Sequence, residues 1–224
     1  IINAMNKQNT ITLVESLLID YANGSLPLAL AVLVETHISM NPESARSIQM
    51  LMQLGGALME NSEPISMSED SFNKLMAEID TLQDEEKISQ NVVSNDNDEL
   101  PLPLRNYVLD LDLSKNWRRI GIGLAEQVIH FGDAEIGSAK LYKIAPNAAV
   151  PSHSHEGNEV TLVLSGGFSD EYGTYGPGDI AIQETGAVHK PVADADGECI
   201  VLAVNEGPIV LTGPVGRLLN MLIK

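Results

Sequence analysis

The chain has 224 residues, 44% of them hydrophobic, and a formal net charge of −18 at pH 7. This length allows one large domain or two small ones, and the charge argues against direct binding to nucleic-acid phosphates, which requires Lys and Arg. The longest strongly apolar run, 26–34, is too short to cross a bilayer. The single cysteine, Cys199, excludes an intrachain disulfide framework and indicates a reducing compartment. We therefore expect a soluble, cytoplasmic protein that contacts neither nucleic acid nor membrane, with Cys199 as a buried, inert thiol.

Residues 5–83 have the periodicity of helices and are expected to form a small helical bundle. The capping-box pattern at 12–15 predicts the start of a first helix, and Asn23-Gly24 predicts its end. Ser25 is expected to cap a second helix. Because 26–34 is apolar on nearly every side, this second helix should be buried on most of its surface.

The second helix is expected to end at His37, and Asn41-Pro42-Glu43 predicts the start of a third. Asparagine is a strong N-cap, proline fits the first helical position, and an acid is favoured by the helix dipole. A fourth helix is expected from Ser68. Apolar residues recur at helical spacing in both: Ile48, Leu51, Met52, Leu58 and Met59, then Phe72, Leu75, Met76, Ile79 and Leu82.

Residues 84–103 lose this periodicity and are predicted to be an acidic, flexible linker. Residues 1–100 contain four basic and sixteen acidic residues, a net charge of −12, whereas 101–224 contain nine and fifteen, a net charge of −6. This charge asymmetry indicates that the helical part is the surface for a basic partner.

Residues 104–224 read as strands and turns, and we expect about eight short strands in a barrel or jelly roll. A short helix is also expected at 216–223. The predicted strands are Ile120–Phe131, Gly137–Ile144, Val160–Leu164, Ile180–Gln183, Ile200–Val204 and Ile209–Leu211. The predicted fold class is thus multi-domain α + β, with an N-terminal helical bundle and a C-terminal barrel.

Three candidate metal ligands, His153, His155 and Glu159, lie at alternating positions ahead of a predicted strand. Side chains two residues apart in an extended chain point to the same face, and Glu159 joins the histidines if the intervening turn keeps the phase. His189 is the best candidate for a fourth ligand. Imidazole and carboxylate suit zinc, iron, manganese, nickel or copper. Four such ligands can close a tetrahedral zinc site or leave two positions open on an octahedral ion, and the sequence leaves both arrangements open.

Segments 153–166 and 178–189 resemble the two motifs of the cupin superfamily, small antiparallel β-barrels of jelly-roll type. The first pattern, HxHxxxExxxxxxG, is complete, although Asn147 stands where many cupins have an opening glycine. The resemblance implies one divalent metal, zinc first and iron, manganese or nickel as alternatives. The ligands that it implies are His153, His155, Glu159 and His189.

A helical N-terminal part followed by a cupin resembles the ChrR family of zinc-binding anti-sigma factors. Segments 17–26, 34–37 and 55–60 are similar to that family's helices, and 117–119 and 150–155 to its cupin. The resemblance implies that the helical part binds an extracytoplasmic-function (ECF) sigma factor and keeps it from RNA polymerase. It also implies that the cupin takes part in the release of the sigma factor in response to oxidants.

The helical part departs from the family at its zinc site. The family's motif is His-x-x-x-Cys-x-x-Cys with an earlier histidine, but here His37 is followed by Asn41 and Ser44, and no histidine precedes it. One ligand cannot hold a structural zinc ion. We therefore expect no zinc in the helical part, and we expect His37 to be a helix-end residue favoured by the dipole.

Three functions are weighed. The first is an anti-sigma factor that is not an enzyme. The second is a metal-dependent cupin enzyme of dioxygenase or isomerase type, for which Tyr142, His130 and Glu184 are acid–base candidates only by residue type. The third is a binding module that has lost sigma binding together with its zinc. The sequence favours the first and leaves a homodimer open.

Overall fold

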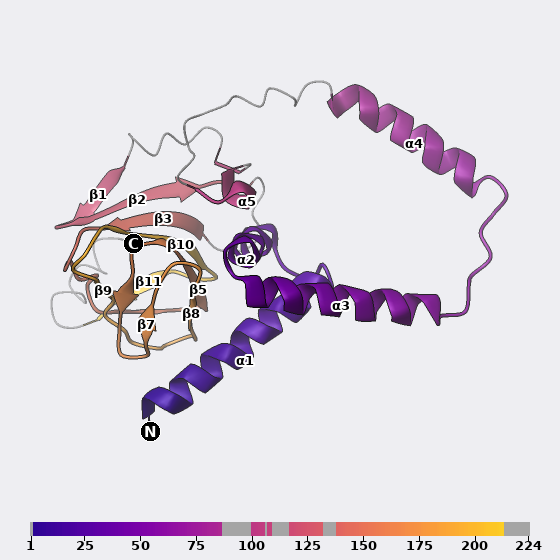
Figure 1. The fold of residues 1–224 in the computed structure, drawn as a ribbon. Coiled ribbons are helices and arrows are strands. Elements are labelled where there is room, and N and C mark those ends of the chain that lie inside the picture. Colours follow the sequence, from indigo (N-terminus) through magenta and orange to yellow (C-terminus); the bar gives the residue numbers. More distant parts are fainter. Residues whose placement is uncertain (1, 87–99, 106, 109–116, 132–137, 213–224) are drawn as a thin grey trace.

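A computed structural model describes residues 2–86, 100–105, 107–108, 117–131 and 138–212, with side chains described from residue 12 to residue 80 in the first range. Within these residues, five helices precede eleven strands, arranged as in Figure 1. The helices are α1 (Ile2–Ala22), α2 (Leu28–Met40), α3 (Pro42–Glu60), α4 (Ser71–Glu86) and α5 (Leu102–Arg105). Within the described residues, no helix is both long enough and apolar enough to cross a membrane. The helix expected at 216–223 lies outside the described residues.

The first helix begins earlier than predicted. α1 runs uninterrupted through Thr12, so Thr12 does not cap its start. No proline or glycine lies between residues 2 and 22 to break the helix. The predicted end is confirmed: the backbone N–H of Gly24 donates to the carbonyl of Tyr21, and Gly24 has a φ of +67°, a conformation that glycine adopts without strain.

The prediction that Ser25 caps the second helix is wrong. α2 begins after Pro27 without a side-chain cap, and the Ser25 hydroxyl donates instead to the carbonyl of Asp20. α2 also continues for three residues beyond His37, to Met40. It stops there because the next residue precedes a proline and takes an extended conformation.

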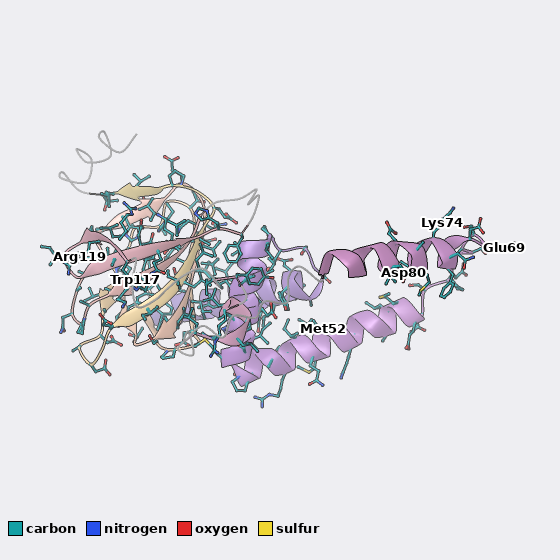
Figure 2. The ribbon with its side chains drawn as sticks, turned by 90° about the horizontal axis from the view of Figure 1, so that it is seen from above. Met52, Glu69, Lys74, Asp80, Trp117 and Arg119 are labelled. Carbon is teal, nitrogen blue, oxygen red and sulfur yellow. The ribbon has the colours of Figure 1, made fainter. Side chains whose placement is uncertain are left out.

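The predicted start of the third helix is confirmed. Asn41 is the N-cap of α3, and its side-chain oxygen accepts hydrogen bonds from the backbone N–H groups of Glu43 and Ser44. α4 begins three residues later than predicted, at Ser71, with the Ser68 hydroxyl hydrogen-bonded to that of Ser71. Figures 1 and 2 show that α3 and α4 extend away from the sheets.

The C-terminal part forms three antiparallel sheets. The largest has the order β1-β2-β3-β10-β5-β8, and the smaller ones are β7-β6-β9 and β11-β4. The single strand expected over 120–131 is a hairpin of β1 and β2, turning at residues 122–123. The strands are β1 (Arg118–Gly121), β2 (Leu124–Ile129), β3 (Ser138–Ile144), β4 (His153–His155), β5 (Glu159–Ser165), β6 (Phe168–Ser169), β7 (Thr174–Tyr175), β8 (Ile180–Gln183), β9 (Val192–Ala193), β10 (Cys199–Asn205) and β11 (Ile209–Leu211).

The central strands of the large sheet are covered on both faces. One face packs against α2 and α5 in a shared apolar core that includes Leu33, Leu104 and Leu162. The strands curve into a barrel (Figure 1). The other face of the sheet points into this barrel and carries a second apolar cluster, which includes Val163 and Cys199. This explains why β5 is buried along nearly its whole length. It also explains why α2, placed between the sheet and the other helices, is apolar on nearly every side.

The segment predicted as a linker overlaps two helices at its ends. α4 extends to Glu86, and α5 begins at Leu102. Leu100 and Leu104 are buried in the core shared with α2. Residues 87–99 lie outside the described residues, so the boundaries 5–83, 84–103 and 104–224 stay predictions.

Candidate metal centre

The barrel brings together the four side chains that the sequence singled out. His153 and His155 lie on β4, and both face inward because residues two apart share a face. Glu159 is the first residue of β5, and its side chain lies with those of the two histidines. The turn at 156–158 therefore returns the chain to the same inward face, as expected. His189 pairs with His153 through two backbone hydrogen bonds of 3.1 Å.

Backbone packing holds that turn in place. A Cβ on Gly157 would lie 2.8 Å from the backbone nitrogen of Gly207, and a Cβ on Gly207 would lie 2.8 Å from the backbone nitrogen of Gly157. Only glycine fits at both positions, so the loops 156–158 and 206–208 lie directly against each other. Asn147, which stands where many cupins have a glycine, has a φ of +60°, a conformation that asparagine tolerates better than most residues.

The ligand atoms of the four residues lie within 4.8 Å of one another, and all four side chains are buried. The Nε2 atoms of His189 and His153 are 3.0 Å apart, and those of His155 and His189 are 3.3 Å apart. The Nε2 of His155 lies 3.6 Å from a carboxylate oxygen of Glu159. Ligands about 2.0–2.1 Å from a tetrahedral zinc ion would be separated by about 3.3 Å, so the donor set fits a single ion.

Hydrogen bonds at the outer nitrogens determine which ring atoms face the centre. The Nδ1 of His153 lies 2.8 Å from the carbonyl of Pro151, and the Nδ1 of His189 lies 3.1 Å from a carboxylate oxygen of Asp170. Carbonyls and carboxylates only accept, so both Nδ1 atoms carry the proton. The two Nε2 atoms therefore present lone pairs to each other at 3.0 Å. This arrangement is repulsive by itself and becomes favourable around a cation.

Burial keeps His153 and His155 neutral at physiological pH. Burial, reinforced by neighbouring histidines, lowers the pKa of His153 and of His155 to about 4. Burial raises the pKa of Glu159, and the nearby His189 opposes this shift. A bound cation favours the carboxylate and neutral imidazoles together, which is the state needed for ligation.

Asp170 and Asn205 support the centre and were not identified from the sequence. Asp170 orients His189 and is itself held by the side-chain amide of Gln183 and by the backbone N–H groups of residues 172 and 173. Asn205 ends β10 opposite Glu159. In the described structure, neither its amide nor the Nδ1 of His155 has a direct hydrogen bond.

Only one of the three acid–base candidates faces the barrel interior. His130 and Glu184 are exposed. Tyr142 lies among the interior residues, where burial and then the carboxylates of Glu126 and Glu159 raise its pKa. A tyrosine with a raised pKa is a poor general base at neutral pH, so the geometry offers little to the enzyme hypothesis.

In the helical part, hydrogen bonds connect residues at positions where the family's motif has zinc ligands. His37 lies in the last turn of α2, as expected, and is buried there. Its Nδ1 donates to the carbonyl of Gly178 at 2.7 Å, and its Nε2 accepts from the hydroxyl of Ser44 at 2.7 Å. His37 therefore joins α2 both to α3 and to the cupin turn ahead of β8.

Comparisons with known proteins agree with this architecture. A family model described as the ChrR cupin-like domain matches residues 108–210. The anti-sigma-E factor ChrR of Cereibacter sphaeroides is 36% identical over 196 residues, which cover 87% of this chain and 89% of that protein. A crystal structure of Rhodobacter sphaeroides SigE in complex with the anti-sigma ChrR matches with a TM-score of 0.69 and 34% identity, and covers 85% of this chain and 96% of the matched chain. The chain therefore belongs to the ChrR family of anti-sigma factors.

Proposed function

We propose that this chain is a cytoplasmic anti-sigma factor whose helical part binds an ECF sigma factor and whose cupin part holds one divalent metal ion. The observation that carries the proposal is a set of exposed apolar side chains on α3, α4 and the loop between them. We call it the docking surface. It consists of Met50, Met52, Leu54, Leu58, Met59, Ile65, Met67, Phe72, Leu75 and Met76.

The docking surface is unusual for a protein that acts alone. Its side chains are between 41% and 91% exposed. Soluble monomers rarely expose apolar patches larger than a few hundred Å², whereas a stable interface buries roughly 800 Å² on each partner. A Cβ built on Gly55 or Gly56 meets nothing within 4 Å, which leaves room for another backbone to approach α3. These features are typical of a helical arm that closes on a protein partner.

Charge favours a sigma factor as that partner. Residues 1–100 carry a net charge of −12. Proteins that bind DNA present Lys and Arg to the phosphates, so an acidic binding domain both attracts such a protein and competes with DNA for its surface. The related ChrR was crystallised in complex with SigE, which supports the same class of partner here.

We assign His153, His155, Glu159 and His189 as the metal ligands, with zinc as the first choice and iron, manganese or nickel as alternatives. The donor set and the neutral histidines support a bound ion. Since α2 packs on the sheet that carries Glu159, a change at this centre has a physical route to the helical part. We expect the cupin to receive the signal that releases the partner.

The test is co-expression of the full chain with the ECF sigma factor encoded beside it, followed by size-exclusion chromatography and a sigma-dependent transcription assay. The double variant Leu54→Asp, Leu58→Asp should lower affinity by about 100-fold or more, because it places charge where apolar surface is buried. The matched control is Ile122→Asp, which changes a fully exposed isoleucine in the β1–β2 turn. If no complex forms, or if both variants bind like the unaltered chain, the proposal is wrong.

A further inference from the structure

Methionines are concentrated on the docking surface. The chain has eight methionines, and five of them are exposed there. The exposed fractions are 62% for Met50, 53% for Met52, 78% for Met59, 76% for Met67 and 41% for Met76. Figure 2 shows Met52 on the arm formed by α3, away from the sheets.

The cysteine of the chain offers no comparable chemistry. Cys199 is fully buried on β10. Burial, with a smaller contribution from Asp194, raises the pKa of its thiol to about 12, so the reactive thiolate is scarce at neutral pH. Among the described residues, accessible oxidisable sulfur is therefore concentrated where the partner is proposed to bind.

The relevant reaction converts a thioether to a sulfoxide. A sulfur lone pair attacks one oxygen of a hydroperoxide, an S–O bond forms and the O–O bond breaks. The departing oxygen takes up a proton and leaves as an alcohol or, from hydrogen peroxide, as water. Sulfur is oxidised by two electrons and the peroxide is reduced by two. The product is polar where the thioether was apolar.

We propose that these five methionines are oxidation sites through which a hydroperoxide weakens the binding of the sigma factor. The inference rests on the proposed function. Each methionine that the partner buries contributes apolar contact, so its conversion to sulfoxide should weaken binding by roughly tenfold. Because the bound partner would shield these side chains, oxidation acts on the free chain and prevents it from rebinding after it dissociates.

The experiment oxidises the full-length chain alone with hydrogen peroxide, removes the peroxide and then adds untreated sigma factor. Mass spectrometry locates the sulfoxides, and titration measures the dissociation constant. The matched control replaces all five methionines with leucine, which is close in volume and cannot be oxidised. Treatment of the oxidised chain with methionine sulfoxide reductases should restore binding.

We expect the treated chain to bind at least tenfold more weakly than the untreated chain. The five-leucine variant, whatever its starting affinity, should bind equally well before and after peroxide. Full binding by a chain with sulfoxide at all five positions would overturn the inference. So would an equal loss of binding by the five-leucine variant, since the damage would then lie elsewhere. If the untreated chain does not bind, the proposed function fails and the inference fails with it, an outcome that the untreated sample distinguishes.

Discussion

Replacing His37 with alanine should destabilise the folded chain by about 3 kcal/mol. The side chain is 3% exposed and makes two hydrogen bonds of 2.7 Å, one to the Gly178 carbonyl and one to the Ser44 hydroxyl. Each bond contributes about 1 kcal/mol net, and the packing lost with the imidazole adds roughly 1 kcal/mol. These contacts connect α2 both to α3 and to the turn before β8, so their removal should be felt by both parts of the chain.

Urea unfolding followed by circular dichroism measures the effect. Since α2 and the large sheet share one core, we expect a single transition whose midpoint falls in the variant. Ser44→Ala removes one of the two bonds and should cost about 1–2 kcal/mol. His130→Ala removes an exposed histidine and should change little. A His37→Ala variant as stable as His130→Ala would refute the assignment of His37 as the link between the two parts.

Three further outcomes follow from the cupin part. Asp170→Asn should weaken metal binding by about 10- to 100-fold in a chelator competition, because it removes the carboxylate that orients His189; unchanged affinity would contradict this role. With metal chelated, the melting temperature should fall as the pH drops from 6.5 toward 4. In this range the histidines of the unfolded chain bind protons, whereas buried His153 and His155, with pKa values of about 4, stay neutral in the folded chain. A melting temperature that rises over this range would contradict the prediction. Cys199 should react with a thiol reagent only after unfolding, and rapid labelling of the native chain would show that it is not buried.

The strand period made the cluster of candidate metal ligands predictable. His153 and His155 are two residues apart, so any extended chain places them on one face. The turn before Glu159 then had only to keep the phase, and two facing glycines allow it to do so. The supporting residues had no such local signal. Asn205 lies opposite Glu159 because β10 pairs with β5, and Asp170 reaches the centre through a side-chain hydrogen bond to His189.

Helix patterns identified the elements of the helical part but not all of their ends. The Asn41-Pro42 signal held because the cap and the proline act within one turn. Thr12 carried the same kind of signal inside a helix that continues through it, since nothing upstream breaks the helix. The role of His37 depends on a carbonyl 141 residues away, and no local pattern contains that information.

The exposed apolar faces of α3 and α4 show why periodicity alone did not locate the core. Ile48 is buried and Leu51 packs against the core, but Leu58 and Met59 at the far end of α3 are exposed. A helix face that binds a partner and one that binds its own core have the same spacing. Only the fold distinguishes them.

The metal content of the purified sigma complex tests the account most directly. We predict one divalent ion per anti-sigma chain by elemental analysis. The ion should be lost in the double variant His153→Ala, His189→Ala, while the complex with the sigma factor persists. Two ions per chain, or a single ion that remains in this variant, would contradict a metal centre confined to the cupin.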